Sequence, residues 1–147
     1  VYNPVSDEMF LAEKGKGAFL NDRRIRVAAR SRLNEAVAAC GLPHYGRGDL
    51  EQFRNEFALV QEQVAGLRRF GSAALDLCYI AAGRFDIYWE RNLSPWDMAA
   101  GAVIVREAGG YVTDLDGRDD MFVKGHIAAG NEALHGDLLK MLKQAAR

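Results

Sequence analysis

The sequence has little of what marks several large classes of protein. Its two cysteines, Cys40 and Cys78, are too few for a scaffold held by disulfides, so we expect a reducing compartment and a cytoplasmic location. No apolar run approaches the roughly 18 residues that a membrane-spanning helix needs, and we expect no membrane partner. An excess of one charge is also missing. The 19 Lys and Arg residues face 20 Asp and Glu residues, so no global field attracts nucleic acid or an anionic membrane.

What is present is an ordinary globular composition. The 147 residues are 49% hydrophobic and 27% charged, which excludes a disordered or collagen-like chain. This length is enough for one domain with a buried core. The chain opens with Val1-Tyr2-Asn3-Pro4-Val5, without an initiator methionine, and this pattern is typical of a strand already under way.

Hydrophobic periodicity predicts an α/β fold in which helices and strands alternate after an initial region of hairpins. The helix predicted at 73–82 is apolar nearly all round except for Asp76, so we expect it to be buried between layers. Helices are predicted at 50–64, 73–82, 96–108 and after Asn131. Strands are predicted at 2–5, 9–12, 18–20, 25–27, 37–40, 66–70, 85–90, 111–113 and 127–129.

Two carboxylates on either side of a strand-to-helix loop form the first candidate site. Glu90 ends a predicted strand, and Asp97 lies in the first turn of the next helix. Ligands gather at the carboxyl ends of strands in α/β sheets, and Mg²⁺ prefers carboxylate oxygens, so both side chains could face a cleft that binds a metal and a phosphate. Asp97 is also explained as the N3 residue of a capping box behind Ser94, and spacing alone favours this cap.

The second candidate site is the turn that contains Gly71, Ser72 and Ala73. Glycine and serine where a strand passes into a helix leave backbone N–H groups free to hold an anion or a substrate oxygen. Ordinary capping of the helix by Ser72 accounts for the same residues, and without further support it is the better explanation.

Basic residues are concentrated in the hairpin region. A solvated hairpin face explains them better than a nucleic-acid patch, because no aromatic platform is interleaved with them. They are Lys14, Lys16, Arg23, Arg24, Arg26 and Arg30.

Three motifs occur in a specific order along the chain. The first is Glu13-Lys14-Gly15-Lys16-Gly17-Ala18-Phe19, and the second is Gly71-Ser72-Ala73-Ala74-Leu75-Asp76. The third is Pro95-Trp96-Asp97-Met98-Ala99-Ala100-Gly101, which continues to Glu107-Ala108-Gly109-Gly110. Together they resemble the carboxy-terminal half of the inositol monophosphatase family of Mg²⁺-dependent phosphomonoesterases. The segment 71–83 most resembles the bacterial members.

The resemblance implies a fold and a role for each candidate residue. The fold would be a mixed β-sheet flanked by helices, as in the carboxy-terminal part of an αβαβα sandwich. Asp97 would ligate the second Mg²⁺ ion, and Glu90 would hydrogen-bond a substrate hydroxyl. The turn would line the sugar-alcohol side of the substrate with Gly71, Ser72 and Ala73.

The family's first signature, Asp-Pro-Leu/Ile-Asp-Gly-Thr, and an upstream glutamate are missing from this sequence. In the family they supply most of the metal ligands. We therefore expect residues 1–147 to be the carboxy-terminal domain of a roughly twice-longer enzyme, without its amino-terminal metal-binding half. We also expect Trp96 to pack beneath the loop and to position Asp97.

The resemblance implies that the complete enzyme hydrolyses a small phosphomonoester, such as an inositol monophosphate, by metal-activated water. It also implies a homodimer, and this chain alone is expected to be inactive. Three alternatives stay open, and one of them is that this chain is only a folding or dimerisation unit. Sugar-bisphosphate or nucleoside-bisphosphate phosphatases of the same superfamily use the same metal site on other substrates. Some bacterial members of the family act as non-catalytic partners of the transcription machinery, which the basic hairpin could serve.

Overall fold

The computed structural model describes residues 1–44, 46 and 48–146. The helices are α1 (Leu50–Gln63), α2 (Ala73–Ala81), α3 (Pro95–Glu107), α4 (Met121–Lys124) and α5 (Glu132–Ala145), with a short 3-10 helix at Leu33–Glu35. The strands are β1 (Tyr2–Asn3), β2 (Glu8–Glu13), β3 (Gly17–Leu20), β4 (Arg23–Ile25), β5 (Val37–Cys40), β6 (Gly66–Arg68), β7 (Ile87–Glu90), β8 (Tyr111–Thr113) and β9 (Ile127–Gly130).

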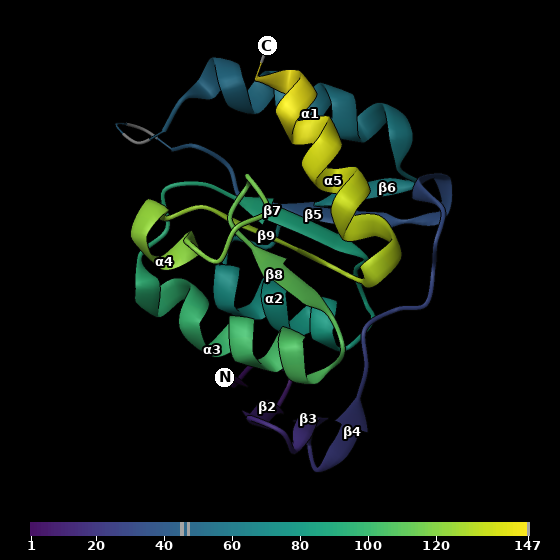
Figure 1. Ribbon diagram of the computed structural model, residues 1–147. Coiled ribbons are helices and arrows are strands. Elements are labelled where there is room, and N and C mark those ends of the chain that lie inside the picture. Colours follow the sequence, from purple (N-terminus) through teal and green to yellow (C-terminus); the bar gives the residue numbers. More distant parts are fainter. Residues whose placement is uncertain (45, 47, 147) are drawn as a thin grey trace.

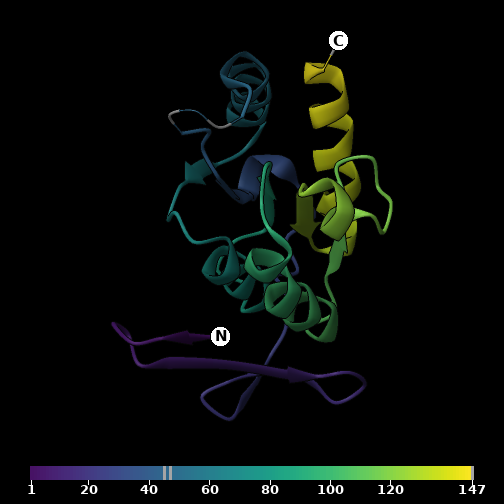
Figure 2. The same ribbon diagram turned by 90° about the vertical axis from the view of Figure 1, so that its left-hand side faces the viewer.

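These elements form four layers (Figure 1). Helices α1 and α5 cover one face of a five-stranded sheet, and α2 and α3 cover the other face. A smaller sheet of β1 to β4 lies beyond α2 and α3, as Figure 2 shows from the side. Within the described ranges, none of the helices has both the length and the apolar character that crossing a bilayer requires.

The larger sheet is mixed, with the strand order β6-β5-β7-β9-β8. Strand β5 pairs in parallel with β6 and β7, so that Ala38 lies opposite both Leu67 and Ile87. Strand β9 pairs with β7 in antiparallel orientation, and β8 pairs with β9 in the same way. The predicted mixed sheet flanked by helices is therefore confirmed, and the carboxyl ends of three parallel strands meet at one edge.

The smaller sheet is antiparallel throughout, and its turns account for two wrong strand boundaries. Asn21 and Asp22 both have positive φ, 45° and 62°, as a two-residue hairpin turn requires. The next residue, Arg23, pairs at once with Leu20, so β4 spans Arg23–Ile25 and not the predicted 25–27. Strand β1 ends at Asn3, before Pro4, which has no N–H to donate to a ladder.

Adjacent side chains of β7 enter two separate cores. Tyr88 is buried with residues of α2 and α3 and with Phe10 of the smaller sheet. Trp89 points to the opposite face and is buried with residues of α1 and α5. Helix α2 lies between the two sheets, and its Leu77 is fully buried, so the prediction that this helix is buried between layers is confirmed.

Gly101 and Glu107 of the third motif each have a structural role. A Cβ atom on Gly101 would lie 2.5 Å from Cδ1 of Leu77, so only glycine lets α3 approach α2 this closely. The Glu107 carboxylate accepts hydrogen bonds from the backbone N–H groups of Gly15 and Gly17, at 2.9 and 2.8 Å. The first and third motifs are thus joined, and the hairpin between β2 and β3 is held against the end of α3.

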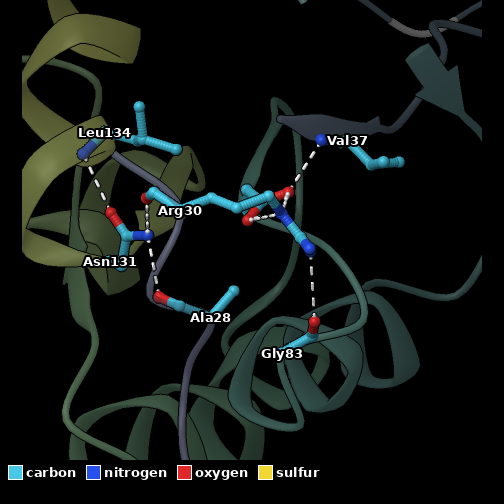
Figure 3. Close-up of polar contacts among 7 residues, drawn as sticks. Ala28, Arg30, Val37, Gly83, Asn131 and Leu134 are labelled. Carbon is cyan, nitrogen blue, oxygen red and sulfur yellow. Dashed lines mark hydrogen bonds and ion pairs between the residues drawn. The ribbon is translucent and has the colours of Figure 1, made fainter. Parts of the chain in front are cut away.

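A buried carboxylate joins the smaller sheet's exit segment to the larger sheet (Figure 3). Asp86 accepts a hydrogen bond from the backbone N–H of Val37 at 2.7 Å and forms an ion pair with Arg30 at 2.8 Å. Asn131 caps α5 through the N–H of Leu134, and its amide donates to the carbonyl oxygens of Ala28 and Arg30. The segment 28–30 is therefore held from both sides.

Candidate active site

A pocket of about 340 Å³ opens at the edge where the parallel strands β6, β5 and β7 end. All the residues that the sequence nominated line it: Glu90, Asp97 and the turn of Gly71, Ser72 and Ala73. The pocket is lined by residues at or after the ends of the parallel strands, namely 71–74 after β6, 42–44 after β5, and 90–93, 96 and 97 at and after the end of β7. This is the place where open α/β sheets bind ligands. Whether these residues bind a substrate or a metal stays a prediction.

Glu90 is held in a defined position at the end of β7. Tyr88 lies two residues earlier on the same face of the strand, and its hydroxyl donates a hydrogen bond to the Glu90 carboxylate. On the other side the carboxylate lies against Gly41, where a Cβ atom would be 1.9 Å from Cδ of Glu90. Any side chain at position 41 would displace Glu90. Sequence reasoning missed this requirement, because it is visible only when the ends of β5 and β7 are side by side.

The environment of Glu90 favours its protonated form in part. Burial raises its pKa above the ordinary value, the hydrogen bond from Tyr88 lowers it, and the negative charge of Asp97 raises it again. Glu90 is half-buried, so one part of the carboxylate faces the pocket. In its ionised form the carboxylate is an acceptor only, so in that form Glu90 can accept a hydrogen bond from a hydroxyl of a bound molecule.

Asp97 caps α3 as the spacing predicts. Pro95 is the first residue of the helix, and Oδ2 of Asp97 accepts a hydrogen bond from the backbone N–H of Ser94 at 2.9 Å. Its second oxygen, Oδ1, receives no hydrogen bond from the described residues. The cap therefore uses one oxygen and leaves the other for a ligand in the pocket, so the two roles are compatible.

The turn at 71–73 has backbone groups that can face a ligand. Gly71 has a positive φ of 85°, and the guanidinium of Arg69 lies against it, 3.3 Å from where a Cβ atom would stand. Ser72 is the residue before α2, as predicted, but within the described ranges its side chain forms no capping hydrogen bond. The N–H groups of the first turn of α2 are therefore not occupied by this serine and can bind an oxygen atom.

The expectation for Trp96 is wrong. Its side chain is 80% exposed and lies at the rim of the pocket, not beneath the loop. The loop is anchored instead by Arg91 and Trp89, which both hydrogen-bond the fully buried Glu56 of α1. These contacts hold the segment after β7 against α1 without any part for Trp96.

The oxygen atoms at the pocket supply only part of the ligands that a metal ion needs. Mg²⁺ takes hard oxygen ligands, commonly one or two carboxylates with waters and phosphate oxygens, and Oδ1 of Asp97 is such a donor at the pocket. The described residues contain no group of three or more His, Cys, Asp or Glu side chains that could surround an ion. A site for two metal ions would need more carboxylates than these residues bring together.

We expect residues 1–147 alone to bind Mg²⁺ weakly and to hydrolyse no phosphomonoester, because they provide one clear ligand. Isothermal titration calorimetry with MgCl₂ and an assay for released phosphate check this. The Asp97→Asn chain is the control: it should release no phosphate and should bind Mg²⁺ no more tightly than the unchanged chain. Tight stoichiometric binding or turnover by the purified chain would contradict the expectation.

Comparisons with known proteins agree with the motifs. The sequence profile described as the inositol monophosphatase family matches residues 1–147. An inositol-1-monophosphatase of Mesorhizobium japonicum is 53% identical over 144 residues, which are 98% of this chain and 54% of that protein. The Nus factor SuhB of Pseudomonas aeruginosa is 46% identical over 145 residues, 97% of this chain and 54% of that protein. The chain thus spans about half the length of the curated relatives it matches.

Solved structures show the same fold. The extragenic suppressor protein suhB from Bartonella henselae superposes with a TM-score of 0.94 at 54% identity, covering 97% of this chain and 55% of that one. The inositol monophosphatase from Anabaena superposes with a TM-score of 0.88 at 38% identity, covering 97% of this chain and 57% of that one.

Proposed function

This chain belongs to the inositol monophosphatase family, and we propose that it forms the substrate-binding part of a Mg²⁺-dependent phosphomonoesterase. The activity is proposed for the complete protein, by which we mean these residues preceded by an amino-terminal half like that of the relatives. The free buried thiols of Cys40 and Cys78 favour a reducing compartment, and we propose a cytoplasmic location.

The observation that carries the proposal is the pocket where three strands end. It brings the turn at 71–73 to the same cavity as Glu90 and Asp97, although helix α2 separates the turn from them in the sequence. Mg²⁺ bound there would supply a nucleophilic water and neutralise charge on the phosphate. The chain's own residues then have separate tasks. Asp97 offers one oxygen to the metal, Glu90 accepts a hydrogen bond from a substrate hydroxyl, and the N–H groups that follow Ser72 bind another substrate oxygen.

Glu90 should control substrate affinity more than the chemical step. A hydrogen bond to a hydroxyl remote from the phosphate acts equally in the ground and transition states, so its loss raises KM with little change in kcat. We expect Glu90→Gln in the complete protein to raise KM for an inositol monophosphate about tenfold, the size expected for a hydrogen bond to a charged group. Steady-state kinetics check this.

Gly41→Ala is a matched variant for the same test. The added methyl group displaces the Glu90 side chain without changing its charge, so KM should rise in the same direction. A substrate without the hydroxyl that Glu90 binds should bind both variants and the unchanged protein alike. An unchanged KM with a collapsed kcat in Glu90→Gln would assign Glu90 to the chemical step and contradict the proposal. Assays with a sugar bisphosphate and a nucleoside bisphosphate decide between the substrate classes.

Asp97→Asn separates a metal ligand from a helix cap. Asparagine still accepts the hydrogen bond from Ser94 and loses only the charge–dipole interaction, about 0.3–1 kcal/mol. Loss of the negative charge weakens attraction for Mg²⁺, so we expect kcat of the complete protein to fall by orders of magnitude while the fold persists. The measurements are the melting temperature without metal and kcat as a function of Mg²⁺ concentration. Normal activity at low Mg²⁺ together with a lowered melting temperature would show that Asp97 is only a cap.

A second candidate function is binding to the transcription machinery, which the name Nus factor among the relatives favours. Arg23, Arg24 and Arg26 are exposed on β4 and just after it, in the smaller sheet. That sheet is separated from the five-stranded sheet by the layer of α2 and α3 (Figure 2). A partner could therefore bind the basic residues without covering the pocket.

Reversing these charges tests the second function independently of the first. We expect the triple variant Arg23→Glu, Arg24→Glu and Arg26→Glu of the complete protein to lose capture of transcription complexes in a pull-down while keeping its kcat and KM. Glu90→Gln is the converse control, with reduced affinity for substrate and normal capture. Equal capture by the triple variant and the unchanged protein would rule out the basic residues as the binding surface.

A further inference from the structure

Asp76 is a buried acidic residue without a hydrogen-bond partner among the described residues. Its side chain is fully buried, and neither carboxylate oxygen has a hydrogen-bond partner among the described residues. It is the one side chain with this property in the part of the chain that the structure describes. A buried ionised carboxylate without partners is strongly destabilising, so such a group needs either protonation or a function that retains it.

The position of Asp76 relates it to the pocket. It lies four residues after Ser72 in the first turns of α2, and its backbone N–H bonds the Ser72 carbonyl oxygen at 2.8 Å. Helical side chains point back toward the amino end of their helix, so the carboxyl group lies beneath the turn at 71–73 that lines the pocket. Asp76 does not line the pocket itself and is buried behind the turn that does.

Asp76 interacts electrostatically with charged and titratable groups of the segments around it. Glu90 is on β7, and its negative charge acts on Asp76 directly. Arg69, in the segment before α2, opposes it. The charge of Asp76 in turn reaches the Tyr88 hydroxyl and the Cys40 thiol. Two further groups, Asp97 of α3 and His44 after β5, act on Glu90 with opposite signs.

These surroundings determine the protonation state of Asp76. Burial raises the pKa of Asp76 to about 7, with Glu90 raising it further and Arg69 and the backbone of Ser72 lowering it. Below that pH Asp76 is a neutral acid and adds no negative charge beside Glu90. Above it, two carboxylates compete within one poorly solvated region.

We propose that Asp76 is a positioning residue of the site, whose neutral carboxylic acid keeps a second negative charge away from Glu90 so that Glu90 can accept the substrate hydroxyl. This inference rests on the proposed function, because it needs Glu90 to contact the substrate. When Asp76 ionises, repulsion moves the Glu90 carboxylate or protonates it, and the hydrogen bond to the hydroxyl weakens. Affinity for the substrate then falls as the pH rises through neutrality.

Folding stability gives a readout that does not depend on activity. The pKa of Asp76 is raised in the folded state, from 3.8 to about 7. Below the lower value both states are protonated, and Asp76 costs no stability. Between the two values the folded state binds more protons, so stability falls as the pH rises, and the full loss is present above the folded pKa. Asparagine never ionises and escapes this loss.

The test uses Asp76→Asn in the complete protein, with Asp22→Asn, an exposed turn residue of the smaller sheet, as matched control. Without metal, Asp76→Asn should raise the melting temperature by about 5 °C or more at pH 8.5 and by much less at pH 4.5. The KM of the unchanged protein, divided by that of Asp76→Asn, should rise up to about tenfold from pH 6 to pH 8.5, as a coupling of about one pKa unit allows. Asp22→Asn should change neither quantity.

Each arm has an outcome that overturns the inference. A KM ratio independent of pH, with the melting shift present, would make Asp76 a buried acid without a positioning role. In the Glu90→Gln background Asp76→Asn should no longer alter the pH dependence of KM, and a persisting effect would show that Asp76 acts elsewhere. A carbon-13 titration of the Asp76 carboxyl in the unchanged protein needs no variant, and a midpoint below pH 5 would refute the neutral acid. Absence of phosphatase activity in the unchanged protein would instead overturn the proposed function, and the positioning role with it, whatever the titration shows.

Discussion

The paired carboxylate of Asp86 is the interaction on which the arrangement of the other elements depends. It is buried at the start of β7, and it binds the backbone N–H of Val37 and the guanidinium of Arg30. Its own N–H donates to the Val37 carbonyl oxygen at 2.8 Å. Asp86 thus aligns the beginnings of two parallel strands and, through Arg30, also binds the segment that leads from the smaller sheet. Because a buried carboxylate that loses its partners costs roughly 3–5 kcal/mol, strand register and chain path are determined together.

The two edges of the larger sheet use carboxylates in opposite ways. At the edge where the parallel strands begin, Asp86 has all its partners and contributes order. At the edge where they end, Glu90 has one protein donor and Asp97 uses one oxygen for its helix, while Asp76, buried behind the pocket in α2, has no partner among the described residues. Unsatisfied groups lower stability, and they also leave hydrogen-bonding capacity for a ligand. The sheet therefore separates the residues that stabilise it from those that face the pocket.

Periodicity and caps predicted the helices and most strands, because these signals are local. The strand-to-helix loop likewise placed Glu90 and Asp97 at one pocket, since Glu90 ends the strand and Asp97 begins the next helix. Helix α4 was missed, because four residues are too few to show a period. The need for glycine at position 41 depends on β5 lying beside β7, and no local pattern reports it. Trp96 was placed on the wrong side of its loop, because a motif fixes a position in the chain and not the direction of a side chain.

The strand order also has a consequence for how the protein folds. Strand β5 has neighbours on both sides that follow it much later in the chain, and each parallel pair needs a helical crossover before it can form. Closing such long loops is slow, so the hairpins of β2, β3 and β4 can form early and the central sheet only afterwards. During synthesis on a ribosome, the free edge of β7 has no partner until β9 has emerged. The exposed strand edge in that interval is the stage at which this chain is most open to association with other chains.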